Sequence, residues 1–214
     1  MSTYGTFHCL DLTPGADPAS AGAALRGAGA ELGLDTPVEL WLSEAPDGGA
    51  RLLAAAHGDP GLVPAAVVLL LAEGVLWRAL VAIDGDEYGT QHAVLVARDG
   101  EARCVHAVLL VNPRNAKDPI DPRSPAYLET AAGLVDPGGP LWSMRRAHLP
   151  ADARNGRRAR SAAAELFGVD PVELERAHAN VVREPHMLEA FWDTYGPWWK
   201  ALGVPLPPWT GTPI

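Results

Sequence analysis

The sequence predicts an α+β fold: a ferredoxin-like (βαββαβ) sandwich with an added β-hairpin extension, followed by a long loop and a C-terminal helical segment. Three observations predict it. Strand-like and helix-like stretches alternate in the order β-α-β-β-α-β over residues 1–83. Residue pairs typical of tight turns separate neighbouring strands. The 214 residues are 48% hydrophobic, which is enough for a substantial core.

The same pattern divides the chain into three parts. Residues 1–112 form the α+β domain, and residues 113–150 are a connection rich in Pro and Gly. Residues 151–214 have helical periodicity, and we expect this segment to pack on the first domain.

The chain begins with a strand and a helix. Residues 3–12 alternate in polarity, and Thr13-Pro14-Gly15 ends the strand. Asp17 followed by Pro18 is typical of a helix start, and Gly33 is typical of a helix end.

A hairpin, a second helix and one further strand follow. Residues 37–44 and 50–57 predict two strands joined by a Pro-Asp-Gly-Gly turn. The helix from Asp59-Pro60 to Gly74 is apolar around most of its circumference, so we expect it to be buried or at an interface. A strand at 76–83 completes the βαββαβ order.

Two more strands, at 90–98 and 101–111, form the added hairpin. Asp99-Gly100 between them is the strongest hairpin signal in the chain.

Three carboxylates, Asp84, Asp86 and Glu87, lie at the tip of the preceding hairpin. Asp and Gly are common at such tips, and the stretch lacks the alternating oxygen ligands of a calcium loop. We therefore predict a turn rather than a metal site, and we take the three carboxylates as candidate binding residues.

Three histidines, His8, His92 and His106, lie on predicted strands. They are the candidate acid/base groups if the chain is an enzyme and the strands are neighbours. Val94 and Val96 alternate with His92, which favours a packed structural histidine instead.

No motif predicts a metal or a cofactor. Cys9 and Cys104 lack the CxxC spacing of zinc sites, and we expect both thiols to be free and buried. The glycine-rich nucleotide loops, GxSxG and HExxH are missing from the sequence.

The second half begins with the connection 113–150, in which a short helix at 126–132 is the one element considered. Helices are predicted at 151–167 and from Asp170-Pro171 to about residue 182. A third helix is predicted from residue 184 to Gly196-Pro197.

Residues 154–182 carry a candidate basic patch, made of Arg154, Arg157 and Arg158. The stretch RSAAAELFGVDPVELERAHANV resembles the helix-turn-helix motif. The resemblance implies DNA binding by these residues, which is our second alternative function. Glu173 and Glu175 at the start of the recognition helix would face phosphates, so we expect no nucleic acid as the main partner.

Trp192, Tyr195 and Trp199 recur at helical spacing near the end of the chain. They form one stripe if the helix continues past the Gly-Pro break. Such a stripe is typical of core packing on a sheet and also of a binding hot spot, so these three are candidate binding residues. The Pro-rich end at 205–214 is expected to lie extended on the surface.

Charge and composition narrow the function. The formal charge of −9 argues against a general nucleic-acid coat and favours a basic partner. No secretory pattern opens the chain, and the longest apolar run falls short of the roughly 20 residues of a membrane span, so we expect a cytoplasmic protein with no membrane partner. The abundance of Ala, Gly, Pro and Arg suggests a bacterial genome rich in G and C.

The favoured hypothesis is a non-catalytic, cytoplasmic binding protein, like an immunity or regulatory protein, that recognises a protein partner through an acidic surface. The first alternative is a small-molecule enzyme or ligand binder with a pocket between the sheet and the C-terminal helices. Whether the chain is an enzyme stays open at this point.

Overall fold

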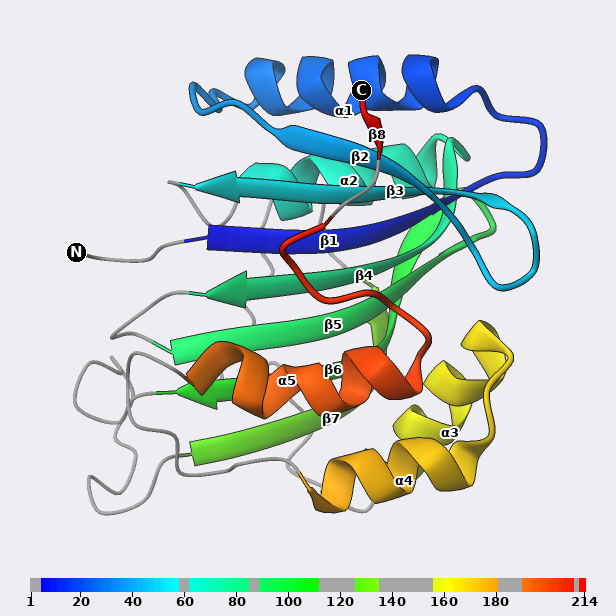
Figure 1. The fold of residues 1–214 in the computed structure, drawn as a ribbon, viewed down its shortest axis with the longest axis vertical. Coiled ribbons are helices and arrows are strands. Elements are labelled where there is room, and N and C mark those ends of the chain that lie inside the picture. The colour runs from blue at the N-terminus through cyan, green and yellow to red at the C-terminus, as the bar shows by residue number, and fades with distance from the viewer. Residues whose placement is uncertain are drawn as a thin grey trace.

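The fold centres on one antiparallel sheet (Figure 1). The computed structural model describes residues 5–57, 62–84, 89–111, 126–134, 156–180, 190–209 and 212–214. In chain order the elements are β1 (Gly5–Leu12), α1 (Pro18–Glu31), β2 (Glu39–Glu44), β3 (Ala50–His57), α2 (Leu62–Ala72), β4 (Leu76–Asp84), β5 (Gly89–Arg98), β6 (Glu101–Val111), β7 (Ala126–Leu134), α3 (Gly156–Phe167), α4 (Pro171–Ala179), α5 (Ala190–Ala201) and β8 (Thr212–Pro213).

The sheet contains eight strands in the order β7-β6-β5-β4-β1-β3-β2-β8. Every neighbouring pair is antiparallel. The α+β class is therefore confirmed. The order of the whole sheet differs from that of a four-stranded ferredoxin-like sandwich, because β5, β6 and β7 continue it beyond β4 and β8 continues it beyond β2.

Several element boundaries follow from local chemistry that the sequence already displays. The Asp17 carboxylate caps α1 by accepting a hydrogen bond from the Ser20 amide at 2.8 Å. Asp170 caps α4 in the same way, from the Val172 amide at 2.8 Å. Asp99 and Gly100 both have positive φ, 56° and 74°, as a tight two-residue hairpin turn requires. These predicted boundaries are confirmed.

The connection predicted for 113–150 contains a strand, and the short helix considered at 126–132 is wrong. Strand β7 pairs with β6 from Val111↔Ala126 to Arg103↔Leu134. Without β7, strand β6 would present a row of unpaired N–H and C=O groups as a sheet edge. Pairing with β7 satisfies these groups. The sequence of β6 carries no local signal that its partner strand lies much later in the chain.

Helix α5 also differs from the prediction, because it passes through Gly196-Pro197 and ends at Ala201. A proline inside a helix costs about 3 kcal/mol. Large aromatic side chains on both sides of it, Tyr195 and Trp198, are fully buried against the sheet. Their burial offsets the cost of the proline.

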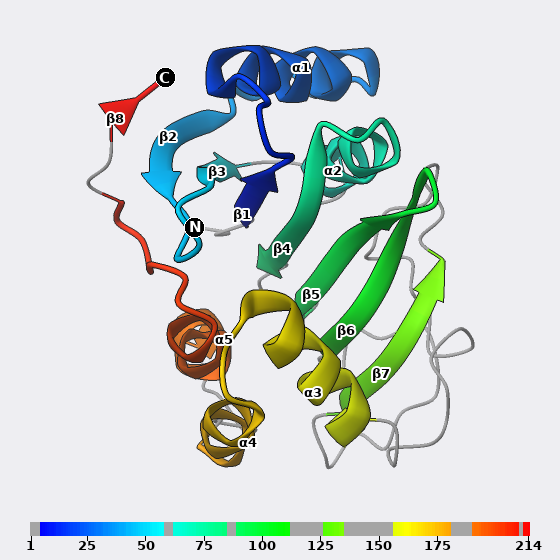
Figure 2. The same cartoon turned by 90° about the vertical axis from the view of Figure 1, so that its right-hand side faces the viewer.

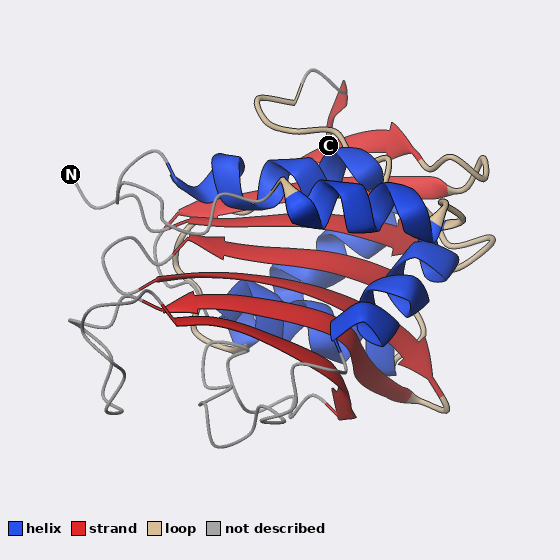
Figure 3. Cartoon of the chain, turned by 90° about the horizontal axis from the view of Figure 1, so that it is seen from below, coloured by secondary structure: helices blue, strands red, loops and turns tan. Residues whose placement is uncertain are grey.

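The two faces of the sheet carry different cores, and Figures 2 and 3 show helices on both sides. We call the side covered by α1 and α2 the aliphatic face. Its buried cluster consists of Ala, Cys, Ile, Leu and Val side chains from the sheet and these two helices. The burial predicted for α2 is confirmed.

We call the side covered by α3, α4, α5 and the chain after them the aromatic face. Its buried cluster includes Phe167, Tyr195, Trp198, Trp199 and Trp209. The C-terminal residues therefore pack on the sheet that the first half of the chain forms.

The Pro-rich end is more than an extended surface segment. Trp209 is buried and meets the ring of Trp41 edge-on, with ring centroids 5.0 Å apart. Beyond it, β8 pairs with Trp41 and Leu42 of β2. The tail thus adds a short strand to the edge of the sheet.

Candidate functional site

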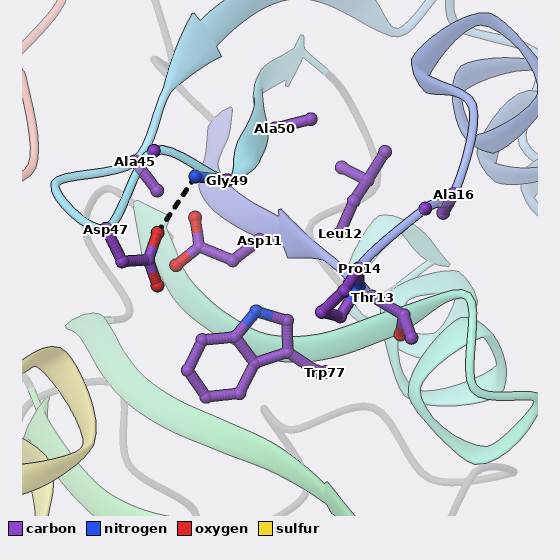
Figure 4. A pocket seen from close by; sticks show the side chains of 12 residues that line it. Asp11, Leu12, Thr13, Pro14, Ala16, Ala45, Asp47, Gly49, Ala50 and Trp77 are labelled. Carbon is purple, nitrogen blue, oxygen red and sulfur yellow. Dashed lines mark hydrogen bonds between the residues drawn. The ribbon is translucent and has the colours of Figure 1, made fainter.

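The candidate site is an open pocket at one end of the sheet, where β1 and β2 finish and β3 and β4 begin (Figure 4). We call this end the pocket end. The pocket has a volume of about 740 Å³. Its lining comes from the end of β1 and the loop to α1, from the β2–β3 turn, and from Trp77 at the start of β4. The carboxylates of Asp11 and Asp47 and the indole of Trp77 point into the same space.

A buried charged cluster, made of Asp11, Arg51 and Arg78, adjoins the pocket through Asp11, which is one of the lining residues. Register places Asp11 of β1 opposite Arg51 of β3 and Arg78 of β4. Arg51 donates from Nε to Asp11 Oδ1 at 2.6 Å and from Nη2 to Oδ2 at 3.1 Å. Arg78 Nε donates to the same Oδ2. Because all three residues are buried, these contacts compensate the cost of removing their charges from water.

The charged cluster also connects the sheet to the C-terminal half. Arg78 Nη1 donates to the carbonyl of Leu166 in α3, and its guanidinium carbon lies 4.3 Å from the centroid of the Phe167 ring. Arg51 Nη1 donates to the carbonyl of Gly203, after α5, at 3.3 Å. One end of the aromatic face is therefore fixed by directional contacts as well as by apolar packing.

Asp47 is held over the pocket by the β2–β3 turn. Its Oδ1 accepts a hydrogen bond from the Gly49 amide at 3.1 Å. Gly48 has φ of 80°, a conformation that glycine adopts without strain. Oδ2 lies 3.9 Å from Arg78 Nη2, beyond hydrogen-bond distance, and the side chain is 56% exposed. The turn thus fixes the carboxylate and leaves one oxygen open to a ligand.

The three candidate histidines do not form one site. His92 and His106 lie on the aromatic face, with ring centroids 5.9 Å apart, and both rings contact Trp198. His8 lies opposite Ala54 and Val81, which belong to the aliphatic face. Register therefore places His8 on the other side of the sheet, a feature that strand prediction alone does not decide.

Burial keeps two of these histidines neutral. It lowers the pKa of His8 to about 3. The pKa of His92 is lowered well below its ordinary value by burial and, to a smaller extent, by the charge of His106. Neither ring nitrogen of His8 or His92 has a hydrogen-bond partner in the described part of the chain. These two rings act as core side chains.

Cys9 and Cys104 are free and buried, as predicted. They belong to opposite faces of the sheet, and burial raises the pKa of each thiol to about 12. Within the described ranges, no group of three His, Cys, Asp or Glu side chains stands close enough to hold a metal ion.

The candidate carboxylates at 84–87 belong to the opposite end of the sheet from the pocket. Asp84 is the last residue of β4 and lies opposite Gly5 at the start of β1, whereas Asp11 is near the end of β1. Asp86 and Glu87 lie outside the described residues.

The aromatic stripe of α5 is part of the core. Tyr195 and Trp199 are fully buried, and Trp192 is half-buried against Phe7 and Trp199. The Tyr195 hydroxyl accepts a hydrogen bond from the Thr90 hydroxyl at 2.9 Å. Tyr195 and Trp199 were predicted as candidate binding residues, but neither side chain reaches the surface.

The candidate basic patch lies on α3, and its charge is partly compensated by α4. Arg157 and Arg158 are exposed, and Arg154 lies outside the described residues. Arg157 Nε is 3.9 Å from the Glu175 carboxylate, which also accepts two hydrogen bonds from Arg160 at 2.8 and 3.0 Å. The hydrogen bond from Arg160 lowers the pKa of Glu175.

Sequence reasoning missed the charged cluster beside the pocket and the lining residue Asp47. Arg51 and Arg78 interrupt apolar strands, and a charged residue in such a position signals a buried partner. Asp47 appeared as a turn residue, because nothing local distinguishes it from other turn aspartates.

Comparison with known proteins adds no relative: no protein-family model, no curated protein and no solved structure matches the chain significantly. Among the described residues, the helices are too short or too polar to cross a membrane.

Proposed function

We propose that the chain is a non-catalytic binding protein that recognises a basic segment of a protein partner, as an immunity or regulatory protein would, with the pocket end as the contact region. The observation that carries the proposal is the open pocket of about 740 Å³, in which Asp47 presents a half-exposed carboxylate beside Trp77. Trp is enriched where proteins recognise each other, and a carboxylate provides the charge for a basic partner.

The charge around the pocket supports a basic partner. Glu44 ends β2 beside the turn that holds Asp47, and Asp17 follows Ala16 of the pocket lining. Both side chains are exposed. The hydrogen bonds from Ser20 lower the pKa of Asp17, so its carboxylate is charged at neutral pH. Together with the overall charge of −9, these groups attract a cationic segment and speed its association.

The chemistry of the pocket supports binding rather than catalysis. Its described lining contains no histidine, cysteine, serine or lysine, and one of its two carboxylates, Asp11, is engaged by Arg51 and Arg78, which leaves Asp47 without a second acid/base group beside it. The histidines that an enzyme would use lie elsewhere, with His8 and His92 fully buried and without hydrogen-bond partners among the described residues. A general base must reach the proton it removes, and these two rings have no such access.

A small molecule is the second candidate ligand, because the pocket volume falls in the range of about 300 to 1,000 Å³ that small-molecule sites occupy. This pocket lies at the end of the sheet, whereas the sequence-based alternative placed it between the sheet and the C-terminal helices.

We also propose that β1 to β4 with α1 and α2 form a ferredoxin-like unit within the larger sheet. The segment β4-β1-β3-β2 of the strand order and the position of both helices on one face support it. A fragment limited to residues 1–84 that folds alone would agree with this, and a fragment that stays unfolded would argue against it.

The function is tested by binding of the full chain to an array of unrelated peptides graded in net charge, at low and at physiological salt. We expect retention to rise with the Lys and Arg content of the peptide and to weaken with salt. Equal binding of acidic and basic peptides, or no binding at all, would contradict the proposal.

A double variant and a triple variant then locate the contact region. The pair Glu44→Gln and Asp47→Asn alters the pocket end, and the triple change Asp84→Asn, Asp86→Asn and Glu87→Gln alters the opposite end. We expect the first to lose most of the basic-peptide binding. Loss with the triple variant alone would move the interface to the 84–87 hairpin.

A further inference from the structure

We infer that the pocket takes a single cationic group, the ammonium of a lysine or the guanidinium of an arginine, which binds the Asp47 carboxylate on the open side of the pocket that Trp77 also lines. This inference deepens the proposed function, on which it rests for the source of the cation, a side chain of a protein partner.

The hydrogen-bonding groups of the lining select for a ligand that donates. The Asp11 carboxylate already accepts hydrogen bonds from Arg51 and Arg78, so Asp47 Oδ2 is the open carboxylate oxygen of the described lining. The Thr13 hydroxyl already donates to the Gly74 carbonyl at 2.7 Å. Among the lining side chains this leaves the indole N–H of Trp77 as the donor. An ammonium offers three N–H groups and a guanidinium five, so either can donate a hydrogen bond to Asp47 Oδ2.

Asp47 is organised for such a ligand before the ligand arrives. The Gly49 amide fixes Oδ1, and Oδ2 has no hydrogen-bond partner within the described residues. A Cβ at residue 49 would lie 3.1 Å from Oδ1, so the glycine makes room for this position of the carboxylate. A fixed acceptor loses little entropy on binding.

The site already contains an internal example of the interaction. The guanidinium carbon of Arg78 lies 4.2 Å from the centroid of the Trp77 ring, and its nitrogens face Asp11 and Asp47. An aromatic ring combined with carboxylates is therefore the environment that this part of the fold provides for a cation. Two arginines and two aspartates here sum to zero charge, and the exposed residues Glu44 and Asp17 add negative charge next in sequence to the lining residues Ala45 and Ala16.

The test is an NMR titration of the full chain with N-acetyl-arginine amide, and with N-acetyl-citrulline amide as a neutral probe of the same shape. We expect the arginine probe to shift the indole signal of Trp77 and the amide signals of the β2–β3 turn. Roughly ten-fold weaker binding is expected for the citrulline probe, because the charge-assisted hydrogen bond is lost. Equal shifts with both probes would overturn the inference. Larger shifts with acetate, an anion, than with the arginine probe would also overturn it.

Three variants and one control assign the effect to the site. Asp47→Asn keeps the shape of the side chain and should weaken the arginine probe roughly ten-fold. Trp77→Leu should weaken it about three-fold by removing the ring. Gly49→Ala should weaken it by displacing the Asp47 carboxylate. Asp99→Asn makes the same charge change in the β5–β6 turn, which is not part of the pocket lining, and should leave binding unchanged.

Asp47, Gly49 and Asp99 are turn residues, so their variants decide the matter even if Trp77→Leu fails to fold. Unchanged binding by Asp47→Asn, or an equal loss with Asp99→Asn, would overturn the inference.

The two proposals fail in different ways. If basic peptides bind wild type and Asp47→Asn equally, the proposed function stands and the cation site in the pocket is wrong. If the arginine probe binds at the pocket but no basic peptide is retained, the cation site stands and the protein partner is wrong.

Discussion

The aliphatic and aromatic faces of the sheet solve the same packing problem with different side chains. On the aliphatic face, α1 and α2 bury a cluster of Ala, Cys, Ile, Leu and Val, and both helices lie close in sequence to the strands they cover. On the aromatic face, the cluster includes Trp, Tyr and Phe rings, and the charged cluster of Asp11, Arg51 and Arg78 adds hydrogen bonds.

The difference follows from how each covering layer reaches the sheet. The short connections around α1 and α2 restrict where these helices can dock, so non-directional apolar burial is enough. Helices α3 to α5 come from far along the chain, and many positions would bury their apolar surface. Arginine hydrogen bonds to the carbonyls of Leu166 and Gly203 distinguish one position from the others.

The largest effect is expected from Asp11→Asn. The change leaves two buried arginines without their carboxylate, which costs about 3 to 5 kcal/mol of the free energy of unfolding. Urea denaturation measures it. Leu10→Ala, next in the chain on the aliphatic face, is the matched comparison and should cost about 2 to 5 kcal/mol by leaving a cavity.

Near-UV circular dichroism separates these two variants. We expect Asp11→Asn to change the tryptophan bands, because Trp77, Trp198 and Trp199 lie on or next to the face that the cluster organises. Leu10→Ala should leave the bands nearly unchanged. Similar spectra for both variants would show that the charged cluster does not organise the aromatic face.

The second effect is acid sensitivity, which both faces should share. The unfolded chain binds a proton on each histidine near pH 6.5, whereas burial keeps His8 neutral in the fold down to a pKa of about 3. The stability is therefore fully present above pH 6.5 and falls as the pH decreases. The loss from His8 is about 2 kcal/mol between pH 6.5 and pH 5, and His92 contributes in the same direction.

Urea denaturation across this pH range measures that slope. His8→Leu and His92→Leu should each flatten it, because each removes a buried imidazole whose pKa is lowered in the fold. If only one of the two buried positions changes the slope, the two faces differ in how well they exclude protons.

The smallest effect concerns one hydrogen bond on the aromatic face. A double-mutant cycle of Thr90→Val and Tyr195→Phe should give a coupling of about 1 kcal/mol, because the two hydroxyls are buried and 2.9 Å apart. Thermal or urea denaturation of the four proteins gives the value. A coupling near zero would mean that ring packing alone holds α5 at this point.

The interpretations that depended on a few neighbouring residues were confirmed. The capping aspartates at 17 and 170, the Asp99-Gly100 turn and the β2–β3 hairpin are all formed. Each rests on hydrogen bonds or backbone angles within a few residues, which the sequence displays directly.

The interpretations that depended on distant contacts were incomplete or wrong. Strand β7 forms because the edge of β6 needs a partner, and α5 continues through Pro197 because its aromatic residues meet the sheet. The pocket went unnoticed because its lining joins the end of β1, the β2–β3 turn and the start of β4.

By itself, the sequence determined which segments are strands and helices in most of the described chain, where many of them begin and end, and that the protein is acidic. The tertiary structure alone decided that His8 lies across the sheet from His92 and His106, and that Asp11, Asp47 and Trp77 line one pocket. The physical reason is that register and docking depend on contacts between residues far apart in the chain, whereas caps and turns depend on neighbours.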